Sequence, residues 1–469
     1  MEYGGMRALA SPSYCRPLRF MNRVLSFCGI AAIAFSFRIQ SAQGEEKANP
    51  GRVCDRNGIV LMEVGKGTEG TRIFNYPLKA LGAQLLSGLD PAILPQPGET
   101  VYLTIDARAQ AAAEKALRAV SRGCAVVMDS DNGDILAMAS VPSFDPNARD
   151  LSVLKNDPTD PLRNRAISAV PPGATFLPVT ALAGLAAGLR GFQQDCTGSV
   201  LIGNRMMKCW IADKDGGHGR QGLAEGMKNS CNTFWYQYGV ATGIVKIDSI
   251  ASLLGLGLLT GIPLKDEAPG VIPGTEWLKK INPRAEWTDG LTANTAIGQG
   301  DVLVTPLQMT VVAAAIGNEG SIWQPRLVDR IVRRDGKMTE TKKTIRARLA
   351  DAGIPRQDVE IVRESMRQSV NESDGNARKA ATPGFAVAGR TGTSQIWRSG
   401  QRDNVTAFIG SADSAKGHYA FSVFVEGAKS GGGVAAPLAA RILAGLESKE
   451  KPAAMDPAVG SFNFVDAVE

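Results

Sequence analysis

The chain has 469 residues, of which 44% are hydrophobic and 21% are charged. This is ordinary globular usage, and it excludes a largely disordered, collagen-like or coiled-coil protein. The 52 basic and 46 acidic side chains give a formal charge of +6, and no basic block is interleaved with aromatics, so we predict no nucleic-acid partner. The two histidines, His218 and His418, are too few for a multi-histidine metal site and argue against a Ser–His–Asp triad.

The start of the chain has the pattern of an export signal. An uncharged run, Val24–Phe37, follows Arg23 and ends before Arg38. It is shorter than the about 20 residues that span a bilayer, but it suits the apolar region of a signal peptide, and Ala42–Gly44 offers a small-x-small cleavage site. We therefore predict that residues 1–44 are a signal peptide or an uncleaved membrane anchor. The rest of the chain is then expected in the periplasm or at the outer face of the cytoplasmic membrane.

Clear local patterns begin about one hundred residues into the chain. A strand is predicted over 101–105, and Asp106 is suited to cap a helix over 107–122. An Asp-Asn-Gly turn then joins two apolar runs, 124–128 and 135–139, which predicts a β-hairpin.

The remaining chain alternates between long helical and strand-rich stretches. Ala- and Leu-rich segments predict helices within 174–190, 222–256 and 292–318. A β-rich block is predicted over 385–428, and a last helix over 435–448. Strands early and late with helices between them predict a mixed α/β (α+β) domain whose sheet joins distant parts of the chain.

These patterns divide the chain into four parts. After the leader, we predict a short N-terminal linker or pedestal remnant over 45–100 and the main domain over 101–449. Residues 450–469 are predicted to be a flexible tail. The charged stretch 333–348 is expected to be a solvated insertion.

Five cysteines remain after the leader, and they have no C-x-x-C spacing. This argues against a zinc ribbon or a redox motif, so we predict no metal and no cofactor. Cys196 and Cys209 are close enough in sequence to form a short disulfide loop in an oxidising compartment, but two buried thiols fit the sequence equally well. Both interpretations remain open.

Three short motifs carry the chemical information in the chain. Pro171–Pro178 (PPGATFLP) resembles P-P-G-S-T-F-K-P, Ser230–Asn232 resembles S-x-N, and Arg390–Thr393 resembles K-T-G-T. Their flanks strengthen the match: Leu103–Asp106, Gly133–Ser140, Asn164–Ala166, Gly217–Gly219, Ala296–Asp301, Thr305–Gln308 and Asp55–Gly58. Over about residues 52–446 the chain resembles the class B penicillin-binding proteins, a family of peptidoglycan D,D-transpeptidases, and in particular its elongation-type members.

The resemblance implies a fold and a ligand. The expected fold is the penicillin-binding protein/β-lactamase-like transpeptidase fold, a mainly antiparallel sheet flanked by helices plus an all-helical lobe. In the family, a serine hydroxyl attacks the penultimate D-Ala carbonyl of a peptidoglycan stem peptide, and a lysine one helical turn later accepts its proton. The resemblance therefore implies a stem peptide or another cell-wall component as ligand.

Two substitutions separate this chain from the family. The nucleophile position holds Ala174 and the base position holds Leu177. A methyl group cannot be acylated, and an isobutyl group cannot accept a proton. Thr175 is adjacent in sequence, but one residue turns a helical side chain by about 100°, so its hydroxyl does not replace the serine. Both losses together indicate a protein that no longer needs the acyl-transfer step.

The other family positions are retained or changed conservatively. Ser230 and Asn232 stand where the family relays protons and holds the substrate amide. Arg390 replaces the family lysine and keeps a positive charge with a fork suited to a carboxylate. Together with Thr391, Gly392 and Thr393, Arg390 is predicted to bind the terminal carboxylate of the ligand.

Several functions remain open at this stage. The first is a pseudo-transpeptidase that binds or scaffolds cell-wall components. Its cleft is then either a groove that still binds peptide or one that binds nothing. The second is an active D,D-transpeptidase with a non-standard nucleophile, for which Ser230 is the candidate. The third is a non-covalent sensor of muropeptides or β-lactams. Only residues 59–102 separate the two N-terminal family motifs, so an extended pedestal for a membrane protein partner is not expected, although such a partner remains possible.

Overall fold

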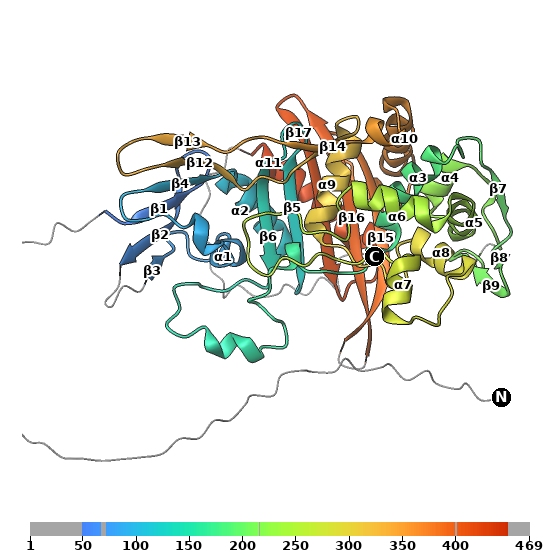
Figure 1. The fold of residues 1–469 in the computed structure, drawn as a ribbon, viewed down its shortest axis with the longest axis horizontal. Helices are drawn as coiled ribbons and strands as arrows, with labels where there is room; N and C mark the ends of the chain where they lie inside the picture. The colour runs from blue at the N-terminus through green and yellow to red at the C-terminus, as the bar shows by residue number, and fades with distance from the viewer. Residues whose placement is uncertain (1–48, 67–71, 215, 399–400, 449–469) are drawn as a thin grey trace, which may run out of the picture. The chain divides into compact units, whose positions relative to one another are not determined.

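Strands from distant parts of the chain form the central sheet of the computed structural model (Figure 1). The structure describes residues 49–66, 72–214, 216–398 and 401–448. The five strands run antiparallel in the order β15(Ala386–Arg398), β16(Gln401–Ser414), β17(Gly417–Glu426), β5(Gly123–Asp129) and β6(Ile135–Val141). The predicted hairpin and the predicted late β-block are therefore neighbours in one sheet.

Helices cover both faces of this sheet. α2(Ala107–Leu117) and α11(Ala436–Leu446) pack together on one face, and α9(Pro306–Gly317) packs on the other. The Asp106 side chain accepts hydrogen bonds from the backbone N–H groups of Arg108 and Ala109, at 2.9 and 3.4 Å, so its predicted capping role is confirmed. The helix ends at Leu117, five residues before the predicted end at 122.

The helical lobe contains the local feature that positions the site. The helical stretch predicted over 222–256 is divided into α4(Leu223–Asn229), α5(Asn232–Thr242) and α6(Ile244–Leu253). Ser230 ends α4 in the left-handed conformation, with φ 53° and ψ 42°, and Gly243, with φ 81°, separates α5 from α6. The S-x-N motif thus lies at a sharp break between two helices.

A second sheet is built from N-terminal and later strands. Its order is β13(Met338–Glu340), β12(Val328–Val332), β4(Thr100–Leu103), β1(Gly51–Cys54), β2(Val60–Lys66) and β3(Arg72–Asn75). The segment expected as a linker or pedestal remnant, 45–100, contributes β1, β2 and β3 to this sheet and also contains α1(Ala83–Ser87). β13 comes from the expected insertion. The predicted leader and the predicted tail lie outside the described residues.

The remaining helices and strands complete the description. They are α1(Ala83–Ser87), α3(Leu177–Ala186), α7(Thr275–Ile281), α8(Asp289–Ala296), α10(Arg356–Asn371), β7(Gln194–Cys196), β8(Ser199–Ile202), β9(Arg205–Lys208), β10(Gly219–Gln221), β11(Ser321–Trp323) and β14(Ile345–Arg348). Within the described ranges, no helix combines the length and the apolar character that a membrane crossing needs. The predicted α/β (α+β) class and the antiparallel sheet flanked by helices are confirmed.

Candidate functional site

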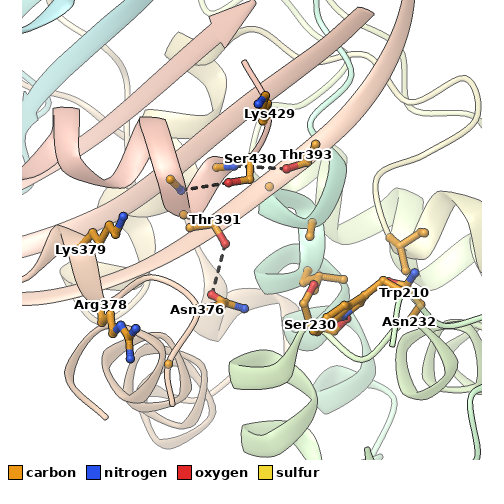
Figure 2. Close-up of a pocket in the computed structure, with 18 of the residues that line it drawn as sticks. Trp210, Ser230, Asn232, Asn376, Arg378, Lys379, Thr391, Thr393, Lys429 and Ser430 are labelled. Carbon is orange, nitrogen blue, oxygen red and sulfur yellow. Dashed lines mark hydrogen bonds between the residues drawn. The ribbon is translucent and has the colours of Figure 1, made fainter. Parts of the chain in front are cut away.

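A groove of about 800 Å³ lies along β15, the edge strand of the central sheet. Figure 2 shows Thr391 and Thr393 of this strand, with Ser230, Asn232 and Trp210 on another wall. Most of the predicted site residues line the groove: Ala174, Leu177, Ser230, Asn232, Thr391, Gly392 and Thr393. Three motifs, the first and last of which are more than two hundred residues apart in sequence, therefore meet in one cavity.

The two substituted positions lie where the resemblance places them. Ala174 belongs to a single 3-10 turn, Gly173–Phe176, and Leu177 begins α3 directly after it. Ala174 is half-buried and Leu177 is 1% exposed, and both contribute to the groove wall. The groove wall at these two positions is therefore purely aliphatic.

Thr175 does not supply a replacement hydroxyl. Its side chain is 0% exposed, and its Oγ1 donates a hydrogen bond to the carbonyl of Pro172 at 2.8 Å. The turn is held against β15 by glycines: a Cβ on Gly173 (φ 54°) would lie 2.7 Å from the Thr393 carbonyl oxygen. Thr175 therefore stays turned away from the groove.

Ser230 is in contact with a cation. Its Oγ accepts a hydrogen bond from Nη2 of Arg390 at 2.5 Å, so its own proton is free to be donated. The indole N–H of Trp210, which is 48% exposed, donates to the carbonyl oxygens of Asn229 and Ser230 at 3.2 and 3.1 Å. These contacts fix the left-handed Ser230 at the groove wall.

Arg390 lies behind the groove and does not line it. It is 0% exposed, and its Nε and Nη1 have no hydrogen-bond partner among the described residues. Burial lowers the pKa of its guanidinium to about 9, which still leaves it charged at neutral pH. The structure thus differs from the expectation that the fork of Arg390 is presented to a carboxylate, because the guanidinium reaches the groove only through Ser230.

A buried cation without a carboxylate partner carries an uncompensated desolvation cost, so we expect Arg390→Met to leave the fold intact and to raise the free energy of unfolding by about 1–4 kcal/mol. Arg165 is a matched control, because it is equally buried but its Nε lies 3.0 Å from Oε1 of Glu426. Arg165→Met removes one of the two arginines paired with that carboxylate, leaving Nε of Arg122 at 3.3 Å from Oε2, and should lower the free energy of unfolding. Urea unfolding of the three proteins measures both effects, and a large loss in Arg390→Met would contradict this account.

The two threonines of β15 differ in what they offer to a ligand. The Thr391 hydroxyl donates to Oδ1 of Asn376 at 3.2 Å, and the amide orientation is set because Nδ2 donates to the Lys228 carbonyl at 2.7 Å. The Thr391 hydroxyl oxygen therefore offers the groove a hydrogen-bond acceptor, because its proton is already donated. The Thr393 hydroxyl oxygen accepts from the backbone N–H of Gly431 at 3.3 Å, so its proton remains available for a carboxylate.

A cluster that the sequence analysis missed lies beside the S-x-N loop. Cys196, Cys209, His218 and Cys231 place one ligand atom each within 4.8 Å of all the others. Nδ1 of His218 lies 3.6 Å from Sγ of Cys196 and 3.5 Å from Sγ of Cys209. All described cysteines are free, so Cys196 and Cys209 form no disulfide in this structure.

These four residues fit a tetrahedral zinc site. With Zn–S bonds of about 2.3 Å and Zn–N bonds of about 2.0 Å, tetrahedral ligand atoms lie about 3.5–3.8 Å apart, and three thiolates with one imidazole are a usual structural set. The three cysteines are buried. The hydrogen bond between the Cys209 and Cys231 thiols lowers the pKa of Cys209 and raises the pKa of Cys231, so one of the two is favoured as the thiolate. A thiolate is the form that binds metal.

The cluster escaped the sequence analysis because its members are dispersed over residues 196–231. Cys196 ends β7, Cys209 follows β9, His218 precedes β10, and Cys231 stands between Ser230 and Asn232. The pairing of β7 with β10 brings Cys196 beside His218. A signal was present in the sequence, since the only histidine near the S-x-N motif is flanked by cysteines on both sides.

The sequence matches the family described as "Penicillin binding protein transpeptidase domain" over residues 123–444. Peptidoglycan D,D-transpeptidase MrdA of Salmonella typhimurium is 31% identical over 379 residues, which cover 74% of this chain and 59% of MrdA. Stage V sporulation protein D of Bacillus subtilis is 30% identical over 414 residues, which cover 83% of this chain and 60% of that protein. The chain thus spans less than two thirds of the length of these relatives.

Solved structures agree with this similarity. Pseudomonas aeruginosa PBP2 in complex with WCK 5153 superposes with a TM-score of 0.71 at 28% identity, covering 85% of this chain and 95% of that one. The D,D-transpeptidase domain of a peptidoglycan glycosyltransferase from Eggerthella lenta gives a TM-score of 0.71 at 26% identity, with coverages of 85% and 98%. The family match extends over more than half of the chain. The chain therefore belongs to the penicillin-binding protein transpeptidase family.

Proposed function

We propose that this protein is a pseudo-transpeptidase of cell-wall synthesis, whose groove binds a peptidoglycan stem peptide without acyl transfer. The observation that carries the proposal is the aliphatic wall at Ala174 and Leu177 in a groove that Ser230, Asn232 and Thr393 still line. Acyl transfer needs a nucleophile and a base within hydrogen-bonding reach of each other. Binding needs only the volume and the polar groups of Ser230, Asn232 and Thr393, which are kept.

An active transpeptidase that uses Ser230 is the alternative. Its hydroxyl is free to donate, but the partner of its oxygen is the Arg390 guanidinium, which cannot accept a proton. Across the described ranges, no carboxylate, imidazole or amine is hydrogen-bonded to Ser230. The contacts of Ser230 therefore favour a hydrogen-bond donor for a ligand over a nucleophile.

Incubation with a labelled penicillin separates these functions. We expect no mass increase of the intact protein, because Ala174 offers no atom to acylate. An adduct that maps to Ser230 and is lost in Ser230→Ala would replace the proposal with an active enzyme. Saturable binding of penicillin without an adduct would instead indicate a non-covalent β-lactam sensor.

We further propose a zinc ion as a structural component beside the groove. The support is the set of three thiols and one imidazole within 4.8 Å, one of which, Cys231, lies inside the S-x-N motif. When bound, zinc would cross-link β7, the segment after β9 and the α4–α5 break. The residues Cys196, Cys209, His218 and Cys231 would hold it.

The location and the partners of the protein are also proposals. The uncharged run after Arg23 supports export to the periplasm or the outer face of the cytoplasmic membrane. The cell-wall relatives support the same location, since MrdA is a peptidoglycan D,D-transpeptidase. A membrane protein of the cell-wall machinery would be a compatible partner there.

A further inference from the structure

The cluster beside the groove contains three thiols that lie close enough to react with one another. The ligand atoms of Cys196, Cys209, His218 and Cys231 all lie within 4.8 Å of each other. The thiols of Cys209 and Cys231 are also joined by a hydrogen bond. Because the two sulfurs of a disulfide lie about 2.0 Å apart, a shift of about 3 Å or less would bring two of these sulfurs into bonding distance.

The local backbone favours Cys209 and Cys231 as the pair that forms such a bond. Both residues lie outside helices and strands, since Cys209 follows β9 and Cys231 stands at the break between α4 and α5. Cys196 belongs to β7, where its backbone is paired with Gly219 of β10, so its position is more firmly held. Cys209 precedes the exposed Trp210, whereas Cys231 is 0% exposed, so a small oxidant reaches Cys209 first.

Both cysteines adjoin residues of the groove wall. Cys231 is flanked by Ser230 and Asn232. Cys209 is followed by Trp210, whose indole N–H donates to the Ser230 carbonyl at 3.1 Å. Figure 2 shows Trp210, Ser230 and Asn232 together on one side of the groove. A bond between the two cysteines would draw their segments together and so change the shape of this wall.

We propose that Cys209 and Cys231 form a redox switch, in which hydrogen peroxide oxidises their thiolates to a disulfide, releases zinc and reshapes the groove wall. This rests on the zinc site proposed above and specifies its regulation. Disulfides persist in an oxidising compartment such as the periplasm. The oxidised form would therefore last until a thiol reductant reverses it by exchange.

The reaction balances with peroxide as the two-electron oxidant. The Cys209 thiolate attacks one peroxide oxygen, an S–O bond forms, the O–O bond breaks, and the leaving hydroxide takes up a proton to become water. The Cys231 thiolate then attacks the sulfur of this sulfenic acid, an S–S bond forms, the S–O bond breaks, and the second hydroxide leaves as water after taking up a proton. Two thiolates are oxidised and one peroxide is reduced. The cluster thereby loses two of its four ligands for zinc.

The test uses the zinc-loaded full chain, treated with hydrogen peroxide that is afterwards removed with catalase. We expect zinc to be released in equimolar amount, measured with a colorimetric chelator, and the intact mass to fall by two hydrogens. Peptide mapping without reductant should find Cys209 joined to Cys231. Treatment with dithiothreitol and then zinc should restore both the mass and the bound metal.

A peptide titration reports on the groove wall. We expect a peptide ending in D-Ala-D-Ala to bind the oxidised form about fivefold more weakly than the reduced form, the effect of one lost hydrogen bond at Ser230. Equal binding to both forms would overturn the link between the cluster and the groove. Binding to neither form would contradict the proposed peptide-binding function, and with it any effect of the switch on a ligand.

Two variants serve as controls. Cys231→Asp replaces the second thiol with a carboxylate, which can bind zinc but cannot form a disulfide, so this variant should keep its zinc in peroxide. Cys124→Ser removes an equally buried thiol outside the cluster and should respond to peroxide as wild type does. Thermal unfolding of each variant checks that the fold is retained.

The outcomes separate the switch from the zinc site. Wild-type protein that keeps its zinc and its free thiols in peroxide would overturn the switch and leave a structural zinc site standing. A disulfide that contains Cys196 would overturn the assigned pair. Purified protein that holds no zinc and takes up none when it is added would overturn the zinc site itself, and the switch with it.

Discussion

Ala174→Ser combined with Leu177→Lys is expected to restore acylation by penicillin, whereas Ala174→Ser alone should react about a hundredfold or more slowly. A positioned general base accelerates the reaction about 10²–10⁴-fold. Residues three apart share one helix face, so the introduced serine and lysine would both face the groove that Ala174 and Leu177 line now. Burial at position 177 would lower the pKa of the introduced lysine and increase its neutral, proton-accepting fraction. The rate of adduct formation, followed by intact mass, measures the difference.

Two controls accompany this prediction. Ala174→Ser/Leu177→Gln introduces a polar side chain of similar length that cannot accept the proton, and it should behave like the single variant. A buried lysine can cost several kcal/mol of stability at a position that is 1% exposed, so the double variant requires a thermal unfolding measurement. If it does not fold, Ala174→Cys tests the geometry instead, because a thiol at this position should be alkylated by iodoacetamide. Equal acylation of the single and double serine variants would show that Leu177 does not occupy the base position.

Removal of zinc is expected to destabilise the protein. If the free zinc concentration exceeds the dissociation constant of the zinc–protein complex about a thousandfold, zinc binding stabilises the folded state by about 4 kcal/mol. Each kcal/mol of lost stability lowers the Tm of a large domain by about 2 °C, so the Tm should be about 8 °C lower after chelation. Elemental analysis of the purified protein should find zinc in equimolar amount, and its loss should parallel the fall in Tm.

Cysteine variants separate the metal from simple packing. Cys209→Ala should lose the zinc and the Tm difference between chelated and metal-loaded protein. Cys124→Ala is the matched control, because Cys124 is an equally buried thiol outside the cluster. It should keep the zinc and remain sensitive to chelation. A Cys209→Ala variant that retains equimolar zinc would refute the assignment.

The groove and the zinc cluster are physically linked, and this connects both predictions. Cys231 stands between Ser230 and Asn232, and Cys209 is adjacent to Trp210, whose indole N–H donates to the Ser230 carbonyl. Metal that holds these two cysteines together would also hold the groove wall on that side. Peptide titrations therefore need to be made on protein of known zinc content.

The local sequence determined several secondary-structure elements and the positions of the family motifs. The Asn-Gly turn, the capping carboxylate of Asp106 and the apolar hairpin strands depend on neighbouring residues, and the structure forms each of them. The motif spacing identified the family, and it placed Ala174 and Leu177 in the groove, because a short turn followed by a helix has a nearly fixed geometry. What those two side chains lack chemically is readable without any structure.

Only the tertiary structure decided how the remaining groups act. Whether Arg390 meets a ligand depends on burial by segments far away in sequence, and the fold places it behind Ser230 at 0% exposure. The direction of the Thr391 proton depends on Asn376 and on the Lys228 carbonyl. The cysteine and histidine cluster, like the pairing of β4 with β12, joins residues whose separation along the chain carries no periodic signal. Such long-range contacts are set by the packing of whole elements, which no local pattern encodes.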